Sequence, residues 1–382
     1  MHHQYFTGRR RYDEGEKSWR ACNRTHLAEV FGSVQDRLNN PNLGLPTIRD
    51  ILEALGNVAK EPESVTDAEV DAGGVPALWC IPEGCDTDCV LLHCHAGGSV
   101  VFSMNSDRRA AGHLAKAAGI RALVVDFRRS PENKFPAQPD DVETAYRWLL
   151  SQGYRPDKIA TGGHSIGGNL AVSLAIRLRD RGIAQPAAIL SIAAWYDLEL
   201  KNATYKTNAE TDKILSRPLV EFFRDSWLGG TGVAHNDPRV NLMYANLAGL
   251  PPINIYYGAH EVLAGEIREF ADRAKAASVD VSLHSVPGGS ISSCWAPGGF
   301  RKRTLRSPRW DGGCAQGSPS PANHYGRALA AYRDVGYSYM LMPDHVPQIH
   351  RGERAGVAFA YCYDYIQALI DALVLRPDRA SA

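Results

Sequence analysis

The chain has 382 residues, and its 42 Lys and Arg side chains balance its 42 Asp and Glu side chains, so the formal net charge is zero. This balance disfavours nucleic acid or an anionic membrane as a partner, and a content of 44% hydrophobic and 22% charged residues excludes a disordered chain. Because no run approaches the roughly 18 apolar residues of a membrane span and no apolar signal segment opens the chain, we expect a soluble, cytoplasmic protein.

Residues 1–70 are polar and favour helix, and they include a helical run over residues 45–59. A segment of this polarity is poorly suited to a buried core. We therefore expect residues 1–70 to form an N-terminal cap or arm on the domain that follows.

From Val70 onward, short strands alternate with longer amphipathic helices. The expected strands cover residues 75–82, 90–95, 121–126, 158–162, 187–192, 252–257 and 281–286. The expected helices cover residues 110–118, 141–150, 167–180 and 266–277. Alternation of this kind implies right-handed crossovers. The sequence therefore predicts an α/β fold with a doubly wound, mostly parallel sheet.

Four cysteines lie close together near the start of this pattern: Cys80, Cys85, Cys89 and Cys94, with two histidines beside them. Zinc binding is one interpretation, but the spacings lack the paired C-x2-4-C of structural zinc sites. We favour two strand cysteines and two loop cysteines in a reducing compartment. We expect neither a bound metal nor a cofactor.

The order of strands and helices breaks after residue 289. Residues 290–322 are rich in Gly, Ser, Pro and Arg and carry no periodicity, which is typical of an irregular linker. Residues 323–382 recover helix and strand texture. We therefore expect a core at residues 71–289 with a cap insertion at about 198–245, then the linker and an appended strand-helix tail.

The segment Thr161–Asn169 reads T-G-G-H-S-I-G-G-N and contains G-x-S-x-G between an expected strand and the helix after it. In that setting the pattern is typical of a sharp turn that exposes a nucleophilic serine, here Ser165, and tolerates no bulky neighbour. The turn also directs the backbone N–H of Ile166 at the serine oxygen. A glycine-rich turn without catalytic function is the alternative, which the strand-to-helix position disfavours.

A second loop of small residues, His95-Ala96-Gly97-Gly98, directly follows the expected strand at residues 90–95. Small residues let backbone N–H groups approach a tetrahedral oxyanion, which needs preorganised donors. An ordinary βα turn would not explain two such loops on neighbouring strands. The loop is therefore a candidate oxyanion hole.

Three further segments complete a family pattern. Residues 126–137 read D-F-R-R-S-P-E-N-K-F-P-A, residues 241–252 read N-L-M-Y-A-N-L-A-G-L-P-P, and residues 258–263 read G-A-H-E-V-L. Together with the two loops they resemble the hormone-sensitive lipase family of α/β-hydrolases, which comprises esterases, lipases and lactone hydrolases. The resemblance covers about residues 70–289, with Ala96 in place of the first glycine of the family's H-G-G-G.

The resemblance implies a set of site residues and a chemistry. Ser165 would be the nucleophile, Gly97 and Gly98 would join Ile166 as oxyanion donors, and Glu261 would be the triad acid. The implied reaction is hydrolysis of a small-molecule acyl ester or lactone through an acyl-enzyme, without a cofactor. Glu266 is a weaker candidate for the acid and is more typical of a charge at a helix N-terminus.

The family's general base, a histidine shortly after the last strand, is missing. Residues 286–289 read V-P-G-G and are followed by S-I-S-S, and the next histidine is His324. A serine without its base keeps only the contributions of the oxyanion hole and of binding. The sequence therefore predicts a serine esterase or, as the alternative, a catalytically impaired α/β-hydrolase that binds acyl ligands.

Two explanations for the missing base stay open. Read one nucleotide earlier from Gly289 with permissible codons, the sequence can encode Gln-His and an amphipathic closing helix, which suggests a change of reading frame near Gly289. Alternatively, His324, His345 or His350 serves as the base, if the tail folds across the site. Four other histidines are expected in positions that do not suit a base: His93, His95, His164 and His284.

The tail has its own resemblance. Residues 327–369 are similar to the C-terminal end of mannonate dehydratases, which are metal-dependent barrel enzymes, and Asp344 and His345 match their P-D-H. One strand and one helix cannot rebuild an eight-stranded barrel, and the other metal ligands are absent. We therefore interpret the tail as an appended fragment without its own activity, with dehydration of a sugar acid as the alternative.

Overall fold

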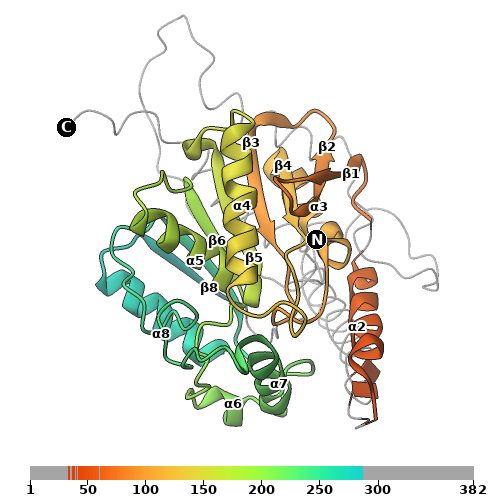
Figure 1. Cartoon of the computed structure of the whole chain (residues 1–382), viewed down its shortest axis with the longest axis vertical. Coiled ribbons are helices and arrows are strands. Elements are labelled where there is room, and N and C mark those ends of the chain that lie inside the picture. Colours follow the sequence, from red (N-terminus) through yellow and green to blue (C-terminus); the bar gives the residue numbers. More distant parts are fainter. Residues whose placement is uncertain (1–32, 35–36, 39, 41, 60, 287–382) are drawn as a thin grey trace, which may run out of the picture.

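One sheet of eight strands organises the chain (Figure 1). The structure is a computed structural model that describes residues 33–34, 37–38, 40, 42–59 and 61–286. The strands are β1 (Val65–Asp71), β2 (Pro76–Pro82), β3 (Asp86–Cys94), β4 (Ile120–Val125), β5 (Ile159–His164), β6 (Ala188–Ile192), β7 (Ile253–Gly258) and β8 (Val281–Val286). The expected linker at residues 290–322 and the tail at residues 323–382 lie outside the described residues.

The strand order in the sheet is β1-β2-β4-β3-β5-β6-β7-β8. β2 runs antiparallel to both of its neighbours, β1 and β4. All other neighbouring pairs are parallel, so the prediction of a mostly parallel α/β sheet is confirmed. Because parallel strands end at the same edge, the loops that follow β3, β5 and β7 gather at one edge of the sheet.

Helices cover both faces of this sheet. They are α3 (Met104–Ala118), α4 (Ala137–Ser151), α5 (Ile166–Asp180) and α8 (Ala264–Ala276). Successive residues of β3 face opposite layers: Leu91 lies in one apolar cluster with Ala111 and Ala115 of α3, whereas Leu92 lies in another with Leu174 of α5. A sheet buried on both faces is the doubly wound arrangement that the sequence predicted, and it explains the continuous apolar run in β3.

The expected helical run near the N-terminus consists of α2 (Leu45–Glu53) and a 3-10 turn, η1 (Ala54–Val58). The sheet then begins at Val65, so the expected division between cap and core at residue 70 is wrong. β1 reads V-T-D-A-E-V-D and is an edge strand whose side chains are mostly exposed. A strand of this kind lacks the apolar alternation by which strands are predicted from sequence.

Helix α3 begins at Met104, earlier than the expected Ala110. Its N-terminus is a capping box in which the Ser103 hydroxyl accepts a hydrogen bond from the Asn105 N–H, and Ser106 Oγ accepts one from the Ser103 N–H at 2.9 Å. The usual box carries Glu or Gln where this chain has Ser106, so the signal was missed. Gly119 ends the helix in the left-handed region, with φ of 66°.

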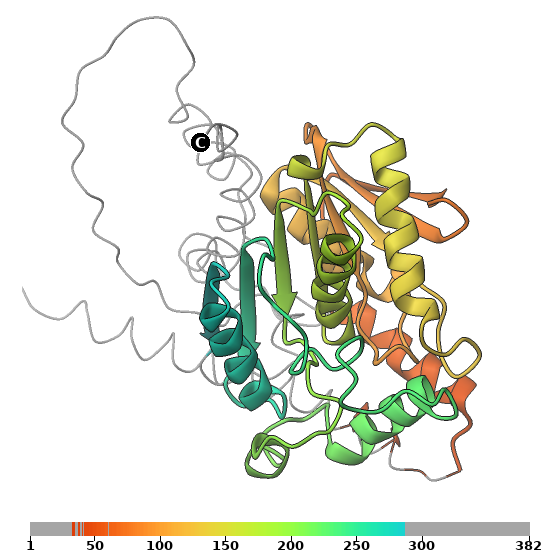
Figure 2. The same ribbon diagram turned by 60° about the vertical axis from the view of Figure 1, so that its left-hand side comes forward.

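The insertion at residues 198–245 carries α6 (Thr204–Thr207) and α7 (Arg217–Leu228). Both helices and α2 lie at the lower end of the sheet in Figure 1, and Figure 2 shows the same arrangement from the side. Trp227 of α7 donates from its indole N–H to Gln138 Oε1 of α4 at 2.8 Å, and its ring meets Phe135 edge-on with centroids 5.9 Å apart. The insertion is thereby anchored to the core.

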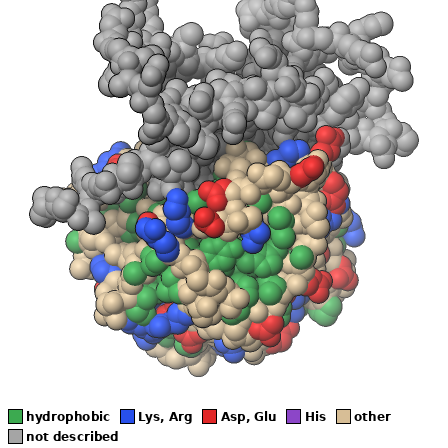
Figure 3. Space-filling view, turned by 90° about the horizontal axis from the view of Figure 1, so that it is seen from above, with side chains coloured by type: hydrophobic (Ala, Val, Ile, Leu, Met, Phe, Trp, Pro, Cys, Tyr) green, Lys and Arg blue, Asp and Glu red, His purple; other side chains and the backbone are tan. Residues whose placement is uncertain are grey.

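The surface carries charges of both signs. In the view of Figure 3, acidic and basic side chains border a central apolar area. In the part of the chain that the structure describes, no helix is long and apolar enough to cross a lipid bilayer.

Two adjacent phenylalanines of α7 test its packing. Phe223 is 5% exposed and Phe222 is 39% exposed. We expect Phe223→Ala to lower the free energy of unfolding by about 3 to 5 kcal/mol because it opens a cavity, and Phe222→Ala to change it by about 0.5 kcal/mol or less. Urea unfolding measures both, and equal losses would contradict the described orientation of α7.

Candidate active site

Ser165 occupies a strained turn between β5 and α5. Its φ of 57° and ψ of −119° lie in a region that residues other than glycine rarely adopt. Two backbone hydrogen bonds hold it there: the Ser165 N–H donates to Ile192 O at 2.9 Å, and the Trp195 N–H donates to Ser165 O at 3.2 Å. The end of β6 and the residues after it therefore fix the serine at the tip of the turn.

The glycines on either side of the serine are sterically required. A Cβ atom on Gly163 would lie 2.5 Å from Cys94 O, and one on Gly167 would lie 2.1 Å from the same oxygen. Both distances are far below van der Waals contact, so only glycine lets the end of β3 pass this close to the turn. The loop after β3 is thereby brought beside Ser165.

That loop carries the predicted oxyanion donors. Gly97 and Gly98 have φ values of 103° and 60°, and the N–H groups of Val100 and Val101 both donate to Gly97 O. Among the described residues, the Gly97 and Gly98 N–H groups donate to no backbone carbonyl. The Ile166 N–H belongs to the first turn of α5, where backbone donors lack partners within the helix.

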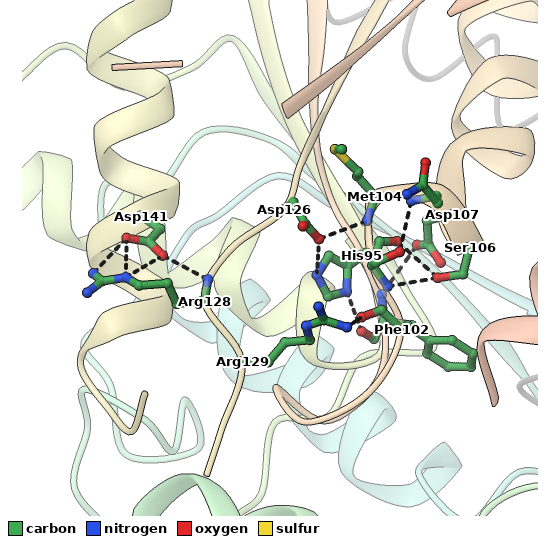
Figure 4. Close-up of polar contacts among 12 residues, drawn as sticks. His95, Phe102, Met104, Ser106, Asp107, Asp126, Arg128, Arg129 and Asp141 are labelled. Atoms are coloured by element: carbon green, nitrogen blue, oxygen red, sulfur yellow. Dashed lines mark hydrogen bonds and ion pairs between the residues drawn. The ribbon is translucent and has the colours of Figure 1, made fainter. Parts of the chain in front are cut away.

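A buried acid and two histidines brace this loop, and Figure 4 shows the acid, Asp107, beside one of them, His95. Asp107 Oδ2 accepts a hydrogen bond from the Ala96 N–H at 3.3 Å and lies 3.2 Å from His93 Nε2. Burial is the largest influence on Asp107 and opposes its ionisation, but the hydrogen bond and charge of His93, together with His95 and His164, outweigh it and lower the pKa of Asp107. No motif in the sequence points to Asp107, although its place as an acid in the first turn of α3 is a signal that could indicate it.

His95 is part of the same bracing. Its Nδ1 lies 2.7 Å from Ala96 O, an acceptor, so Nδ1 carries the proton and donates. Its ring stacks on Phe127 with centroids 3.9 Å apart. Burial lowers the pKa of His95, so the imidazole stays neutral. His95 therefore holds the loop and is not placed as a base.

The segment after β4 supports the loop from its other side (Figure 4). Asp126 Oδ1 accepts a hydrogen bond from the Met104 N–H at 3.1 Å, and the Arg129 guanidinium donates to Phe102 O at 3.0 Å. From α2, Arg49 donates to Val100 O at 2.8 Å. Both ends of the loop are thus tied to neighbouring elements, which keeps its free N–H groups in place.

A pocket of about 40 Å³ opens over Ser165. Its walls come from α2 and η1, the loop after β3, the serine turn, the segment that leads into α7, and α7 itself. The lining residues are Leu52, Leu55, Ala96, Gly97, Gly98, Val101, Phe102, His164, Ser165, Ile214, Leu215, Leu219 and Phe223. Apart from the serine and the neighbouring histidine, these side chains are apolar or absent, so the pocket suits an apolar group.

Glu261 lies in the loop between β7 and α8 and is fully buried. Neither of its carboxylate oxygens has a hydrogen-bond partner among the described residues. Burial raises the pKa of Glu261 well above its usual value, and the nearby Asp212 carboxyl raises it further. Glu261 does not line the pocket that holds Ser165.

Glu266 differs from Glu261 although both are buried. Its Oε1 accepts hydrogen bonds from the Tyr196 N–H at 2.7 Å and the Asp197 N–H at 3.2 Å, and its Oε2 accepts one from the Tyr205 hydroxyl at 3.1 Å. It stands in the first turn of α8. Glu266 is thus occupied in holding the residues that follow β6, a role that its sequence position did not indicate.

The histidines fall in several places. His284 stacks on Tyr256 across β7 and β8 with centroids 4.4 Å apart, and His164 lines the pocket next to Ser165. His324, His345 and His350 lie outside the described residues. Within the described ranges, no histidine forms a hydrogen bond to the Glu261 carboxylate.

The four clustered cysteines are distributed otherwise than expected. Cys80 lies in β2, Cys89 and Cys94 lie in β3, and only Cys85 lies in a turn, so the expected division into two strand and two loop residues is wrong. Burial raises the pKa of the Cys89 thiol to about 11. No group of three or more potential metal ligands occurs in the part of the chain described.

Known proteins resemble this chain over the same region. The family model for the alpha/beta hydrolase fold matches residues 91–292. An acetyl-hydrolase of Streptomyces hygroscopicus is 34% identical over 62% of this chain and 76% of its own length. An esterase crystal structure from the bacterial hormone-sensitive lipase family is 34% identical with a TM-score of 0.66, over 70% of this chain and 91% of that chain.

A second solved structure is that of EstE5 soaked with p-nitrophenyl butyrate. It is 30% identical with a TM-score of 0.64, over 70% of this chain and 88% of that chain. Sequence, fold and the arrangement around Ser165 agree on one conclusion. The chain belongs to the hormone-sensitive lipase family of α/β-hydrolases, a family of ester hydrolases.

Proposed function

We propose that the chain is a serine carboxylesterase that hydrolyses a small acyl ester or lactone through an acyl-enzyme on Ser165. One observation carries the proposal: Ser165 sits on a strained turn in the pocket that Gly97 and Gly98 also line. A nucleophile and oxyanion donors in one pocket are the parts that acyl transfer needs. The reaction needs no cofactor.

In the first half-reaction, Ser165 Oγ attacks the carbonyl carbon and gives its proton to a general base. The carbonyl oxygen becomes an oxyanion that accepts hydrogen bonds from the N–H groups of Gly97, Gly98 and Ile166. Each such donor contributes about 3 to 4 kcal/mol of transition-state stabilisation. The base passes the proton to the leaving alcohol, and water then attacks the acyl-enzyme and releases the acid.

Glu261 is the proposed triad acid, which orients the base and stabilises it when protonated. It is buried and forms no hydrogen bond to the residues that the structure describes, which supports this role because a buried carboxylate without a partner is costly. β8 pairs in parallel with β7 so that Val286 lies opposite Gly258, shortly before Glu261. A base that follows β8 would therefore start from a position close to this acid.

The pocket supports a short acyl group. A water molecule needs about 10 to 15 Å³ of such volume, so a pocket of about 40 Å³ has room for only a few heavy atoms in a row. The acetyl-hydrolase relative and the EstE5 structure soaked with p-nitrophenyl butyrate agree with short acyl chains. We therefore propose acetyl to butyryl esters, or lactones of similar size, as substrates.

The lack of a hydrogen-bond partner for the Glu261 carboxylate in the described part of the chain also favours a second candidate function. Residues 287–293 contain no histidine, so the present chain lacks a base at the position that follows β8. Without a base, the same pocket would bind acyl ligands and hydrolyse them poorly. The predictions below separate an active esterase from this impaired form.

Ser165→Ala should abolish hydrolysis of p-nitrophenyl butyrate, because the attacking oxygen is removed while the pocket remains. Ser151→Ala, in an exposed position at the end of α4, is the matched control. Initial rates by absorbance of p-nitrophenolate measure both. Residual turnover of Ser165→Ala within about tenfold of the parent would contradict the assignment of the nucleophile.

Glu261→Gln should raise the melting temperature at pH 8, and the gain should shrink towards pH 5. Because the pKa of Glu261 is raised in the folded protein above the unfolded value of about 4.3, folding stability falls as the pH rises through that interval. Glutamine stays neutral and removes this loss. Other buried acids are common to both proteins and largely cancel in the comparison.

Thermal unfolding of both proteins across this pH range is the measurement. A lower melting temperature for Glu261→Gln at pH 8 would show the opposite, namely that a cationic partner stabilises the carboxylate. Such a partner would come from residues outside the described ranges, and a tail histidine would then become the leading candidate for the base.

Restoring the alternative reading frame after Gly289 should raise esterase activity by orders of magnitude, because it would return a base that accepts the Ser165 proton. The comparison is a parallel assay of the present protein and the frame-restored variant on p-nitrophenyl butyrate. Similar rates would refute the reading-frame explanation and favour His324, His345 or His350. Activity in the restored form alone would identify the present chain as the impaired form.

A further inference from the structure

Asp212 is a buried acid that the proposed mechanism does not use. It lies between α6 and α7 and is 1% exposed. Its Oδ1 accepts hydrogen bonds from the N–H groups of Ile214 at 3.1 Å and Leu215 at 3.0 Å, and its Oδ2 accepts one from the Val262 N–H at 3.0 Å. One carboxylate thus joins a turn of the insertion to the loop that holds Glu261.

Two neighbours of Asp212 bind the same loop. Thr211 Oγ1 donates to His260 O at 3.0 Å, and Asn208 Nδ2 donates to Glu261 O at 2.9 Å and more weakly to Ala259 O at 3.3 Å. We call Asn208, Thr211 and Asp212 the acid-loop clamp. The clamp fixes backbone groups at residues 259–262, on both sides of the Glu261 side chain.

The other end of the clamp is the pocket wall. Ile214 and Leu215, whose N–H groups Asp212 holds, both line the pocket over Ser165. The position of this apolar wall and the position of the Glu261 loop therefore depend on one side chain.

A charged side chain at the buried position of Asp212 requires a physical explanation. Burial raises the pKa of Asp212, whereas hydrogen bonds from backbone N–H groups and the charge of Lys213 lower it, and the Glu261 carboxyl close by would carry a like charge. An asparagine could make the turn to residues 214 and 215 without these costs. The side-chain NH₂ group of that asparagine would, however, face the Val262 N–H, and two donors cannot form a hydrogen bond. Only a carboxylate accepts both from Val262 and from residues 214 and 215.

We propose that Asp212 is a positioning residue that holds the acyl-pocket wall and the Glu261 loop in one fixed arrangement. The effect on catalysis rests on the proposed function, whereas the link between the two segments does not. Through this link, Asp212 sets both the length of acyl group that the pocket admits and the placement of the acid.

Asp212→Asn tests the link selectively, because it keeps an acceptor for Ile214 and Leu215 and loses the one for Val262. Asp237→Asn is the matched control: Asp237 lies in the same insertion and accepts from the Arg239 N–H at 2.9 Å, within its own segment. Amide hydrogen exchange followed by NMR should show the Val262 N–H exchanging about tenfold or more faster in Asp212→Asn. Ile214 and Leu215 should keep their protection, and Asp237→Asn should match the parent.

Kinetics on p-nitrophenyl butyrate and octanoate test the catalytic part. Asp212→Asn should lower kcat for butyrate about tenfold with little change in KM, and it should weaken the preference for butyrate over octanoate. Unchanged exchange at Val262 would overturn the proposal. Faster exchange with unchanged kcat and unchanged preference would also overturn it, since the link would then be merely structural.

The two proposals fail in distinguishable ways. If the parent hydrolyses neither ester, the proposed esterase function fails, and exchange at Val262 alone decides whether Asp212 holds the two segments together. If the parent is active and Asp237→Asn lowers kcat as much as Asp212→Asn does, the positioning role is overturned while the esterase function stands.

Discussion

The left-handed backbone at Ser165 is the constraint on which the site depends. A non-glycine residue held at φ of 57° costs about 1 to 3 kcal/mol and persists only where its surroundings force it. Here Gly163 and Gly167 leave no space beside Cys94 O, and Ile192 O accepts the Ser165 N–H. The same contacts that impose the strain bring β3 and β6 against the turn, so the serine, the loop that carries Gly97 and Gly98, and the loop after β6 are positioned together.

Those parts of the molecule that obey short-range rules could be predicted from the sequence. The strand at residues 281–286 has the predicted bounds, and the glycines on either side of Ser165 predict the turn at the serine. β1 could not be predicted in this way, because an exposed edge strand needs no apolar side chains. The helix that carries Trp227, α7, lies in an insertion whose packing partners, Phe135 and Gln138, are distant in sequence.

The roles of the buried polar residues were the least predictable part of the site. Asp107 lies in the first turn of α3, but the residues around it in the sequence do not indicate that it accepts a hydrogen bond from the Ala96 N–H. The sequence around Asp212 indicates its role even less, because that role depends on a hydrogen bond from Val262, which lies far along the chain. Local sequence suggests the proposed nucleophile, whereas the residues that hold it in place depend on which loops the sheet brings to one edge.

Three buried carboxyl groups near this edge differ in how they are satisfied. Glu266 accepts from two backbone N–H groups and the Tyr205 hydroxyl, and Asp212 accepts from three backbone N–H groups. Glu261 accepts from none within the described residues. A buried carboxyl group without hydrogen-bond partners lowers the stability of the fold, and the other two acids show that backbone N–H groups can supply such partners. The difference supports the proposed role of Glu261 as the acid that meets a cationic partner, and it is independent of the motif that first suggested the residue.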